Sequence, residues 1–234
     1  MTKTIYFITQ AKGGAGKSVL AFMLAEKYKE AVVLDLDDAT TTSMKQLAYR
    51  DPVRVSFLDL STRRIDRGAF NGLFESIIRD NDSLFIADLG ASVAEQLPKY
   101  FLMNGVDVVR QTLLENGIAL QIICVIGGGN IFKATMEYLV ELIESVNGAF
   151  PVVVAHNGFY PLSEIQDEDL KDFVKRNHLT LIHFDLVKDK GESAMRTIEN
   201  VLKAGKGISG LSPFTSLYFR KPIEELNLGG HGTE

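Results

Sequence analysis

Short apolar runs rich in β-branched residues alternate along the chain with longer segments whose apolar residues recur every three or four positions. The short runs predict strands and the longer segments predict amphipathic helices. The predicted strands are TIYFIT, AVVLDL, VRVSFLDL, SLFIADL, ALQIICVIG, PVVVAHN and LTLIHF. The predicted helices cover Lys17 to Glu30, Ala69 to Arg79, Val93 to Met103, Phe132 to Asn147, Ser163 to Arg176 and Glu192 to Ala204.

This alternation is typical of α/β proteins built from successive strand and helix units. We therefore predict one domain with a mostly parallel, twisted sheet of about seven strands and helices on both faces. Ser212 and Pro213 mark the start of a C-terminal helix over 213–226, because serine caps helices and proline suits their first turn. We expect the domain to cover 1–226 and a flexible, glycine-rich tail to cover 227–234.

Composition narrows the class of protein without adding a site. The 234 residues carry a formal net charge of -5, so nothing in the total charge favours nucleic acid or an anionic membrane. The sequence has no apolar run of the roughly 18 residues that a membrane span needs and no cleavage site after MTKTIYFITQ. We expect a cytosolic protein. Cys124, the single cysteine, lies in a buried-strand pattern and is interpreted as a core thiol.

The segment QAKGGAGKSVLA contains the candidate chemistry. Ala11 to Ser18 fit the spacing of a phosphate loop between a strand and a helix, with alanine at the first glycine position. In that setting backbone N–H groups and the helix N-terminus form an anion site, Lys17 reaches the β- and γ-phosphates, and the Ser18 hydroxyl binds Mg²⁺. The predicted nucleotide-binding residues are Lys12, Gly13, Gly14, Ala15, Gly16, Lys17, Ser18 and Val19.

Acidic residues end two of the predicted strands. Alternation along VVLDLDD places Asp35 and Asp37 on one side at the carboxyl end of the second strand, where open α/β sheets bind ligands. SLFIADLG reads as a Walker B strand that delivers Asp88 to the same edge, where it would hold Mg²⁺ through water. Gly90 would be a switch II hinge. An acidic turn that caps the next helix is the alternative for Asp35 and Asp37.

Lys12 is not needed for a plain phosphate loop, and a second positive charge beside Lys17 is costly unless an anion neutralises it. Here the sequence resembles the deviant Walker A ATPases of the ParA and MinD class. The resemblance implies that Lys12 crosses a face-to-face dimer to the partner's phosphates, and a solvated surface lysine is the alternative. It further implies that Asp35 supports the magnesium shell and that Asp37 positions the attacking water. Asp38 and Ala39 replace the Pro-Gln of partition ATPases, and no proline follows Asp88.

The resemblance also assigns a role to Asn157. These ATPases commonly use an asparagine at the end of this strand to read the adenine edge, and an amide offers the donor and acceptor this requires. A turn asparagine before Gly158 is the alternative. His156 and His183 are interpreted as structural. Residues 120–162 look like the TraL and StbB branch of conjugative plasmids.

We therefore expect an ATP- and Mg²⁺-dependent homodimeric switch with slow ATPase activity, acting in plasmid partition, stability, positioning or conjugative transfer. A plasmid or conjugation protein would be its partner. The segment 49–68 holds five arginines against three aspartates, which leaves nonspecific DNA binding open beside a solvated surface. A membrane is not expected, because Pro222 and the glutamates after it interrupt any basic helix face.

Two other functions remain open. A metabolic enzyme similar to dethiobiotin synthetase would use ATP to activate a small substrate, and an adaptor would bind nucleotide with little hydrolysis. An electron-transfer ATPase of the nitrogenase iron-protein type is excluded, because its bridging cluster needs two cysteines in each subunit.

Overall fold

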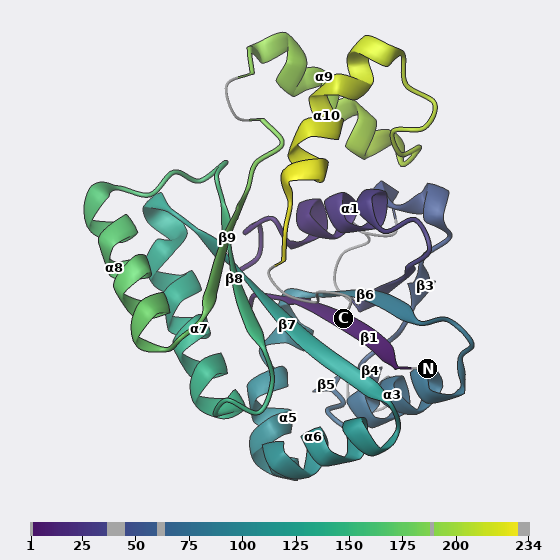
Figure 1. Ribbon diagram of the computed structural model, residues 1–234, viewed down its shortest axis with the longest axis vertical. Helices are drawn as coiled ribbons and strands as arrows, with labels where there is room; N and C mark the ends of the chain where they lie inside the picture. Colours follow the sequence, from purple (N-terminus) through teal and green to yellow (C-terminus); the bar gives the residue numbers. More distant parts are fainter. Residues whose placement is uncertain (1, 37–44, 60–63, 188–189, 229–234) are drawn as a thin grey trace.

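The computed structural model describes residues 2–36, 45–59, 64–187 and 190–228. Seven strands in this part of the chain form one parallel sheet in the order β3-β2-β6-β1-β7-β8-β9 (Figure 1). These strands are β1 (Lys3–Thr9), β2 (Val32–Leu36), β3 (Val53–Arg54), β6 (Leu84–Leu89), β7 (Ile118–Gly127), β8 (Val152–Asn157) and β9 (Thr180–Phe184). The predicted single-domain α/β architecture is confirmed.

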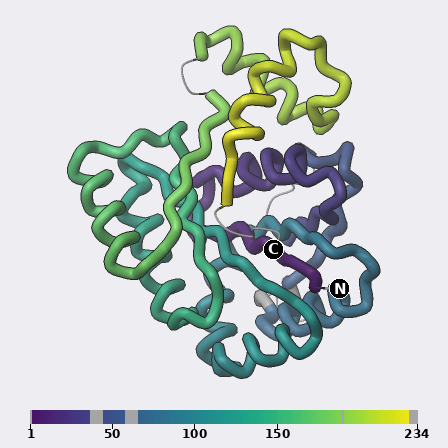
Figure 2. Tube along the Cα trace, in the orientation of Figure 1, coloured from purple at the N-terminus to yellow at the C-terminus, as the bar shows by residue number. Residues whose placement is uncertain are grey.

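Helices cover both faces of the sheet, and α1 (Lys17–Lys27) lies on one face together with the two C-terminal helices α9 (Glu192–Ala204) and α10 (Pro213–Glu225) (Figure 2). The opposite face carries a second group of helices. This group is α3 (Ala69–Arg79), α4 (Ala91–Ala94), α5 (Leu97–Asn104), α6 (Val106–Glu115), α7 (Phe132–Val146) and α8 (Glu164–Arg176). The sheet is thus buried on both sides, which explains why its inner strands read as continuous apolar runs.

The two cores follow the alternation of side chains along the strands. In β1, Ile5 and Phe7 pack toward the α3 and α7 face, whereas Tyr6 and Ile8 pack toward α1. Phe7 is fully buried and stacks on Phe74 of α3 with ring centroids 5.8 Å apart. Cys124 is a buried free thiol in β7, as predicted, and burial raises its pKa well above the usual thiol value.

Helix termini largely follow the capping signals. The Ser163 side chain accepts the backbone N–H of Gln166, whose side chain bonds back to the Ser163 N–H, so α8 begins with a capping box. Ser212 caps α10 through the N–H of Thr215. Phe219 and Ile223 of α10 are buried against the α1 side of the sheet, and Leu228 beyond the helix is buried there too.

Two predicted elements were wrong in extent. The run VRVSFLDL is not one strand: β3 joins the main sheet, while β4 (Leu58–Asp59) pairs with β5 (Arg64–Ile65) in a separate antiparallel ribbon. The chain leaves the sheet because Phe57 turns into the core against Phe70, with ring centroids 4.6 Å apart.

The helix predicted over Val93 to Met103 is two helices, α4 and α5. Pro98 has no N–H to donate to the Ala94 carbonyl four residues earlier, which accepts the Tyr138 hydroxyl instead, and Pro98 suits the first turn of a new helix. The following helix α6 was not predicted. Gly105, with a φ of 76°, separates α6 from α5 and turns the chain between them.

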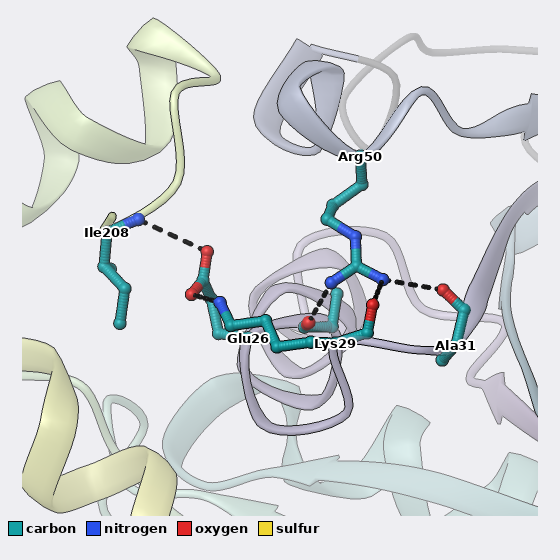
Figure 3. A network of polar contacts seen from close by, with 6 residues as sticks. Glu26, Lys29, Ala31, Arg50 and Ile208 are labelled. Atoms are coloured by element: carbon teal, nitrogen blue, oxygen red, sulfur yellow. Dashed lines mark hydrogen bonds and ion pairs between the residues drawn. The ribbon is translucent and has the colours of Figure 1, made fainter. Parts of the chain in front are cut away.

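A polar network joins the end of α1 to two distant segments (Figure 3). The Arg50 guanidinium, in the short 3-10 helix η1 (Ala48–Arg50), donates to the main-chain carbonyls of Ala25 and Ala31, both at 2.8 Å. Glu26, nearly fully buried, accepts the backbone N–H of Ile208 at 3.3 Å and contacts the Lys29 ammonium. The segment between α9 and α10 and the short helix η1 are therefore both fastened to α1.

Candidate functional site: a phosphate-loop cavity

The loop between β1 and α1 has the backbone that a phosphate site requires. Gly14 and Gly16 have φ values of 78° and 106°, which glycine adopts readily. A Cβ atom at Gly16 would also lie 2.2 Å from the Asn157 Nδ2 atom, so a side chain has no room there. Gly16 is the N-cap of α1, and no side chain caps this helix start. Gly14 and Gly16 are thus required by the geometry, whereas Gly13 has neither a positive φ nor a close neighbour.

The two lysines of the loop have different surroundings. Lys17 is only 8% exposed, and its ammonium donates to the main-chain carbonyl of Gln10 at 2.8 Å. Lys12 is exposed. Its backbone N–H donates to the side-chain oxygen of Gln10 at 3.1 Å. Lys17 therefore belongs to the interior of its own subunit, whereas the Lys12 side chain reaches outward.

Asp35 and Asp88 lie side by side at the carboxyl edge of the sheet. They are register partners on the neighbouring strands β2 and β6, and both are buried. Their neighbours Leu36 and Leu89 pack on the opposite face, so the alternation of side chains turns both carboxylates toward α1. The first turn of α1, with Ser18, lies on that same side.

A cavity of about 570 Å³ brings most of the predicted phosphate and metal groups together. It is lined by Gly14, Lys17, Ser18, Asp88 and Gly90, which come from the loop, α1 and the end of β6. Gln46 lines it as well, and its side-chain oxygen is buried without a hydrogen-bond partner among the described residues. Hydroxyl, carboxylate and amide oxygens are the hard donors that suit Mg²⁺, so this donor set fits a magnesium ion.

A second cavity of about 610 Å³ adjoins the first along Gly14, Gly16 and Val19. Asn157 lines it, together with Phe159, Tyr160 and apolar and charged residues of α9 such as Met195 and Glu199. A mostly apolar hollow with a few polar groups is the usual form of a small-molecule site. The first cavity holds the Lys17 ammonium, the Ser18 hydroxyl and the Asp88 carboxylate, and the second holds an amide and apolar side chains of α9. This is the division expected for the phosphates and the base of a nucleotide.

Asn157 makes two structural contacts: the turn contact that the sequence left open as the alternative, and a contact with the phosphate loop that the sequence did not reveal. Its Nδ2 donates to the main-chain carbonyl of Ala15 at 2.9 Å, and its Oδ1 accepts the N–H of Phe159 at 3.1 Å. The amide therefore braces the loop and its own turn. One N–H and one lone pair stay available for a ligand in the cavity that it lines.

Three of the predicted site residues line neither cavity, namely Lys12, Ala15 and Asp35, although Asp35 lies beside Asp88. Asp37 lies outside the described residues. His156 and His183 contact each other through their Nδ1 atoms at 3.0 Å on β8 and β9. Within the described ranges, no group of three or more histidine, cysteine, aspartate or glutamate side chains could hold a metal ion.

Sequence reasoning missed Gln10, Tyr160 and the wall formed by α9. The Gln10 side chain is fully buried and donates to the carbonyls of Val125 at 2.8 Å and Thr135 at 3.1 Å. Tyr160 donates its hydroxyl to the Gly14 carbonyl at 2.9 Å. A glutamine directly after a buried strand was a usable signal for the first of these residues. No local pattern indicates the Tyr160 contact, because it forms only where the loop after β1 and the turn after β8 lie together in the fold.

Comparison with known proteins supports the fold. No family model matches the chain, and no curated protein sequence matches it. Several solved structures do resemble it. A plasmid partition protein from Borrelia burgdorferi B31, bound to AMPPNP, matches with a TM-score of 0.55 and 12% identity over 96% of this chain and 98% of that one. The chain shares the fold of that protein.

Two further structures give a TM-score of 0.49 each. One is a second plasmid partition protein from Borrelia burgdorferi, at 14% identity over 87% of this chain and 97% of that one. The other is the signal recognition particle receptor FtsY from Elizabethkingia anophelis, at 12% identity over 96% of this chain and 64% of that one. The chain thus spans about two thirds of that receptor's length. In the described part, every helix is too short or too polar to cross a membrane.

Proposed function

We propose that this protein is an ATP-binding switch that dimerises with ATP, hydrolyses it slowly and acts in plasmid partition or a related plasmid process. One observation carries the proposal. Lys17, Ser18 and Asp88 line a single cavity at the start of α1, and that cavity adjoins a second one lined by Asn157. A nucleoside triphosphate has the same two parts, an anionic chain that needs a lysine and N–H donors and a flat base that needs an apolar pocket.

The phosphate side follows from the chemistry of the loop. The N–H groups at the start of α1 and the Lys17 ammonium would bind the phosphates, and Lys17 would leave the Gln10 carbonyl to do so. Ser18 and Asp88 would hold Mg²⁺, with Asp35 in the outer shell beside Asp88. When bound, the ion supplies positive charge that neutralises the phosphate oxygens. In this scheme Gly13, Gly14, Ala15, Gly16 and Val19 shape the phosphate site.

The base side supports adenine. Asn157 retains a donor and an acceptor, which match the N6 and N7 edge of adenine. The AMPPNP bound by the plasmid partition protein of the same fold is an adenine nucleotide analogue, which agrees with this choice. Apolar residues of α9 and the loop after β9 would cover the faces of the ring.

The switch itself rests on Lys12 and Asp37. The Lys12 side chain is exposed and takes no place in either cavity of its own subunit, as expected if it serves a partner's nucleotide. Asp37 follows directly on β2 and would position the attacking water, as the resemblance to the ParA and MinD class implies. A second copy of the chain is therefore the first partner that we propose.

The process served is inferred from fold and resemblance together. The structure with a TM-score of 0.55 is a plasmid partition protein, and residues 120–162 look like the conjugative-plasmid branch of the ATPase class. A plasmid or conjugation protein would read the state of the switch. The case for DNA contact through the arginine-rich segment is weaker than the case for a protein partner. Arg50 is engaged with main-chain carbonyls, and Arg67 donates to Gln96 at 2.8 Å.

Calorimetric titration with ATP and Mg²⁺, followed by phosphate-release assays, tests the proposal. We expect wild-type protein to bind ATP and release phosphate slowly, Lys17→Ala to lose productive binding, and Lys133→Ala to behave as wild type. Lys133 is a matched control because its side chain is 88% exposed on α7, away from both cavities. Wild-type protein that binds no ATP, or Lys17→Ala that binds it equally well, would contradict the proposal.

A further inference from the structure

The turn after β8 holds two consecutive peptide groups of the phosphate loop. The Tyr160 hydroxyl donates to the Gly14 carbonyl, and Asn157 Nδ2 donates to the Ala15 carbonyl, each at 2.9 Å. These two donors come from one short turn more than 140 positions along the chain from the loop. The turn after β8 therefore holds two peptide groups of the loop, the one that contains the Ala15 N–H and the one that contains the Gly16 N–H.

The direction of a carbonyl fixes the direction of the next N–H. In a trans peptide the C=O and the following N–H point in opposite directions. A bond that draws the Gly14 carbonyl toward Tyr160 therefore turns the Ala15 N–H away from Tyr160. In the same way, the bond from Asn157 to the Ala15 carbonyl orients the Gly16 N–H. Glycines on either side of Ala15 leave these peptide planes free to rotate when nothing holds them.

The turn is itself well supported. The Tyr160 carbonyl accepts the Gly128 N–H at 3.0 Å and contacts His156 Nε2 at 3.1 Å, while the Tyr160 N–H donates to the Asn157 carbonyl at 3.0 Å. Gly128 lies so close to this turn that a Cβ atom there would be 2.2 Å from the Pro161 carbonyl oxygen. The loops after β7 and β8 thus form a firm base from which Tyr160 and Asn157 reach the phosphate loop.

We propose that Tyr160 is a positioning residue, assisted by Asn157, that presents the N–H groups of the phosphate loop to an anion. The inference rests on the proposed function insofar as that anion is the phosphate chain of a nucleotide. The competing role is direct contact with the base, because Tyr160 also lines the larger cavity. The two roles differ in what they require of the ligand: a positioning role needs only the phosphates.

The test compares ATP with inorganic tripolyphosphate, which has no base or sugar, by calorimetry in the presence of Mg²⁺. Tyr160→Phe removes only the hydroxyl, and Tyr218→Phe is the matched control because Tyr218 is partly exposed on α10 and lines neither cavity. We expect Tyr160→Phe to weaken the binding of both ligands by the same factor, about three- to tenfold. The control is expected to bind both as wild type does.

Two results would overturn the inference while leaving the proposed function standing. If only ATP binding weakens, Tyr160 contacts the base; if neither changes, its hydroxyl does not position the loop. Wild-type protein that binds neither ligand would overturn both proposals. A second measurement needs no ligand: amide exchange at Ala15 and Gly16 should be faster in Tyr160→Phe than in wild type and in Tyr218→Phe. Equal exchange rates in all three proteins would also contradict the positioning role.

Discussion

The side-chain oxygen of Gln10 accepts the backbone N–H of Lys12 at 3.1 Å, while the main-chain oxygen of Gln10 accepts the Lys17 ammonium at 2.8 Å. One buried residue thus contacts both lysines of the loop. The Gln10 amide is held in turn by the carbonyls of Val125 and Thr135. The start of the loop is therefore fixed to β7 and α7. The bond to the Lys12 N–H then sets the direction in which the main chain leaves the sheet.

Gln10→Met should destabilise the protein and loosen the loop. Methionine has a similar length but cannot donate to the Val125 and Thr135 carbonyls, so the free energy of unfolding should fall by about 1–3 kcal/mol. Urea unfolding measures this, and amide exchange at Lys12 should become faster. Gln111→Met, at an exposed position of α6, is the control and should change neither. A variant at Gln10 with wild-type stability and exchange would show that the network is unimportant.

Arg50→Ala should lower the free energy of unfolding, because Arg50 holds the end of α1. The guanidinium donates to the Ala25 carbonyl in the last turn of α1 and to the Ala31 carbonyl beyond it, and alanine at position 50 cannot make these bonds. We expect a loss of about 2 kcal/mol in the free energy of unfolding, the scale of hydrogen bonds to a charged group. Arg110→Ala on the exposed side of α6 should change the unfolding midpoint little. Equal midpoints for the two variants would refute the capping role.

Stability should decline in strong alkali because of buried tyrosines. Burial raises the pKa of Tyr100 to about 12, whereas an unfolded tyrosine titrates near 10. Between about pH 10 and 12 the unfolded chain loses this proton first, so unfolding is favoured by up to about 1.4 kcal/mol per pH unit. Tyr100→Phe should make the alkaline decline shallower. The slope of unfolding free energy against pH measures this, and an unchanged slope would contradict it.

Much of the fold could be predicted because its signals are local. Strand runs and helix periodicity placed β1, α3, α8 and α9, and the capping serine Ser212 marked α10. The prediction failed where Phe57 leaves the sheet to meet Phe70, and it did not include α6, the helix that follows Gly105.

The same contrast between local signals and tertiary contacts applies to the candidate site. Lys17, Ser18 and Asp88 could be found because spacing and strand ends indicate them, and the cavity brings them together. Tyr160 could not, since its contact with Gly14 depends on how two distant loops meet. For Asn157 the sequence suggested a ligand contact, and the structure adds a bond to the loop itself.

Light scattering tests the central claim, an ATP-dependent dimer that needs Lys12, most directly. The mass of wild-type protein and of Lys12→Ala would be measured with ADP, with ATP, and with ATP and DNA, all with Mg²⁺. We expect ATP to convert wild-type monomer to dimer and Lys12→Ala to stay monomeric while still binding nucleotide, with Asp37→Ala trapped as a dimer. A wild-type mass that is the same in every condition would contradict the dimer switch and favour a metabolic enzyme on this fold.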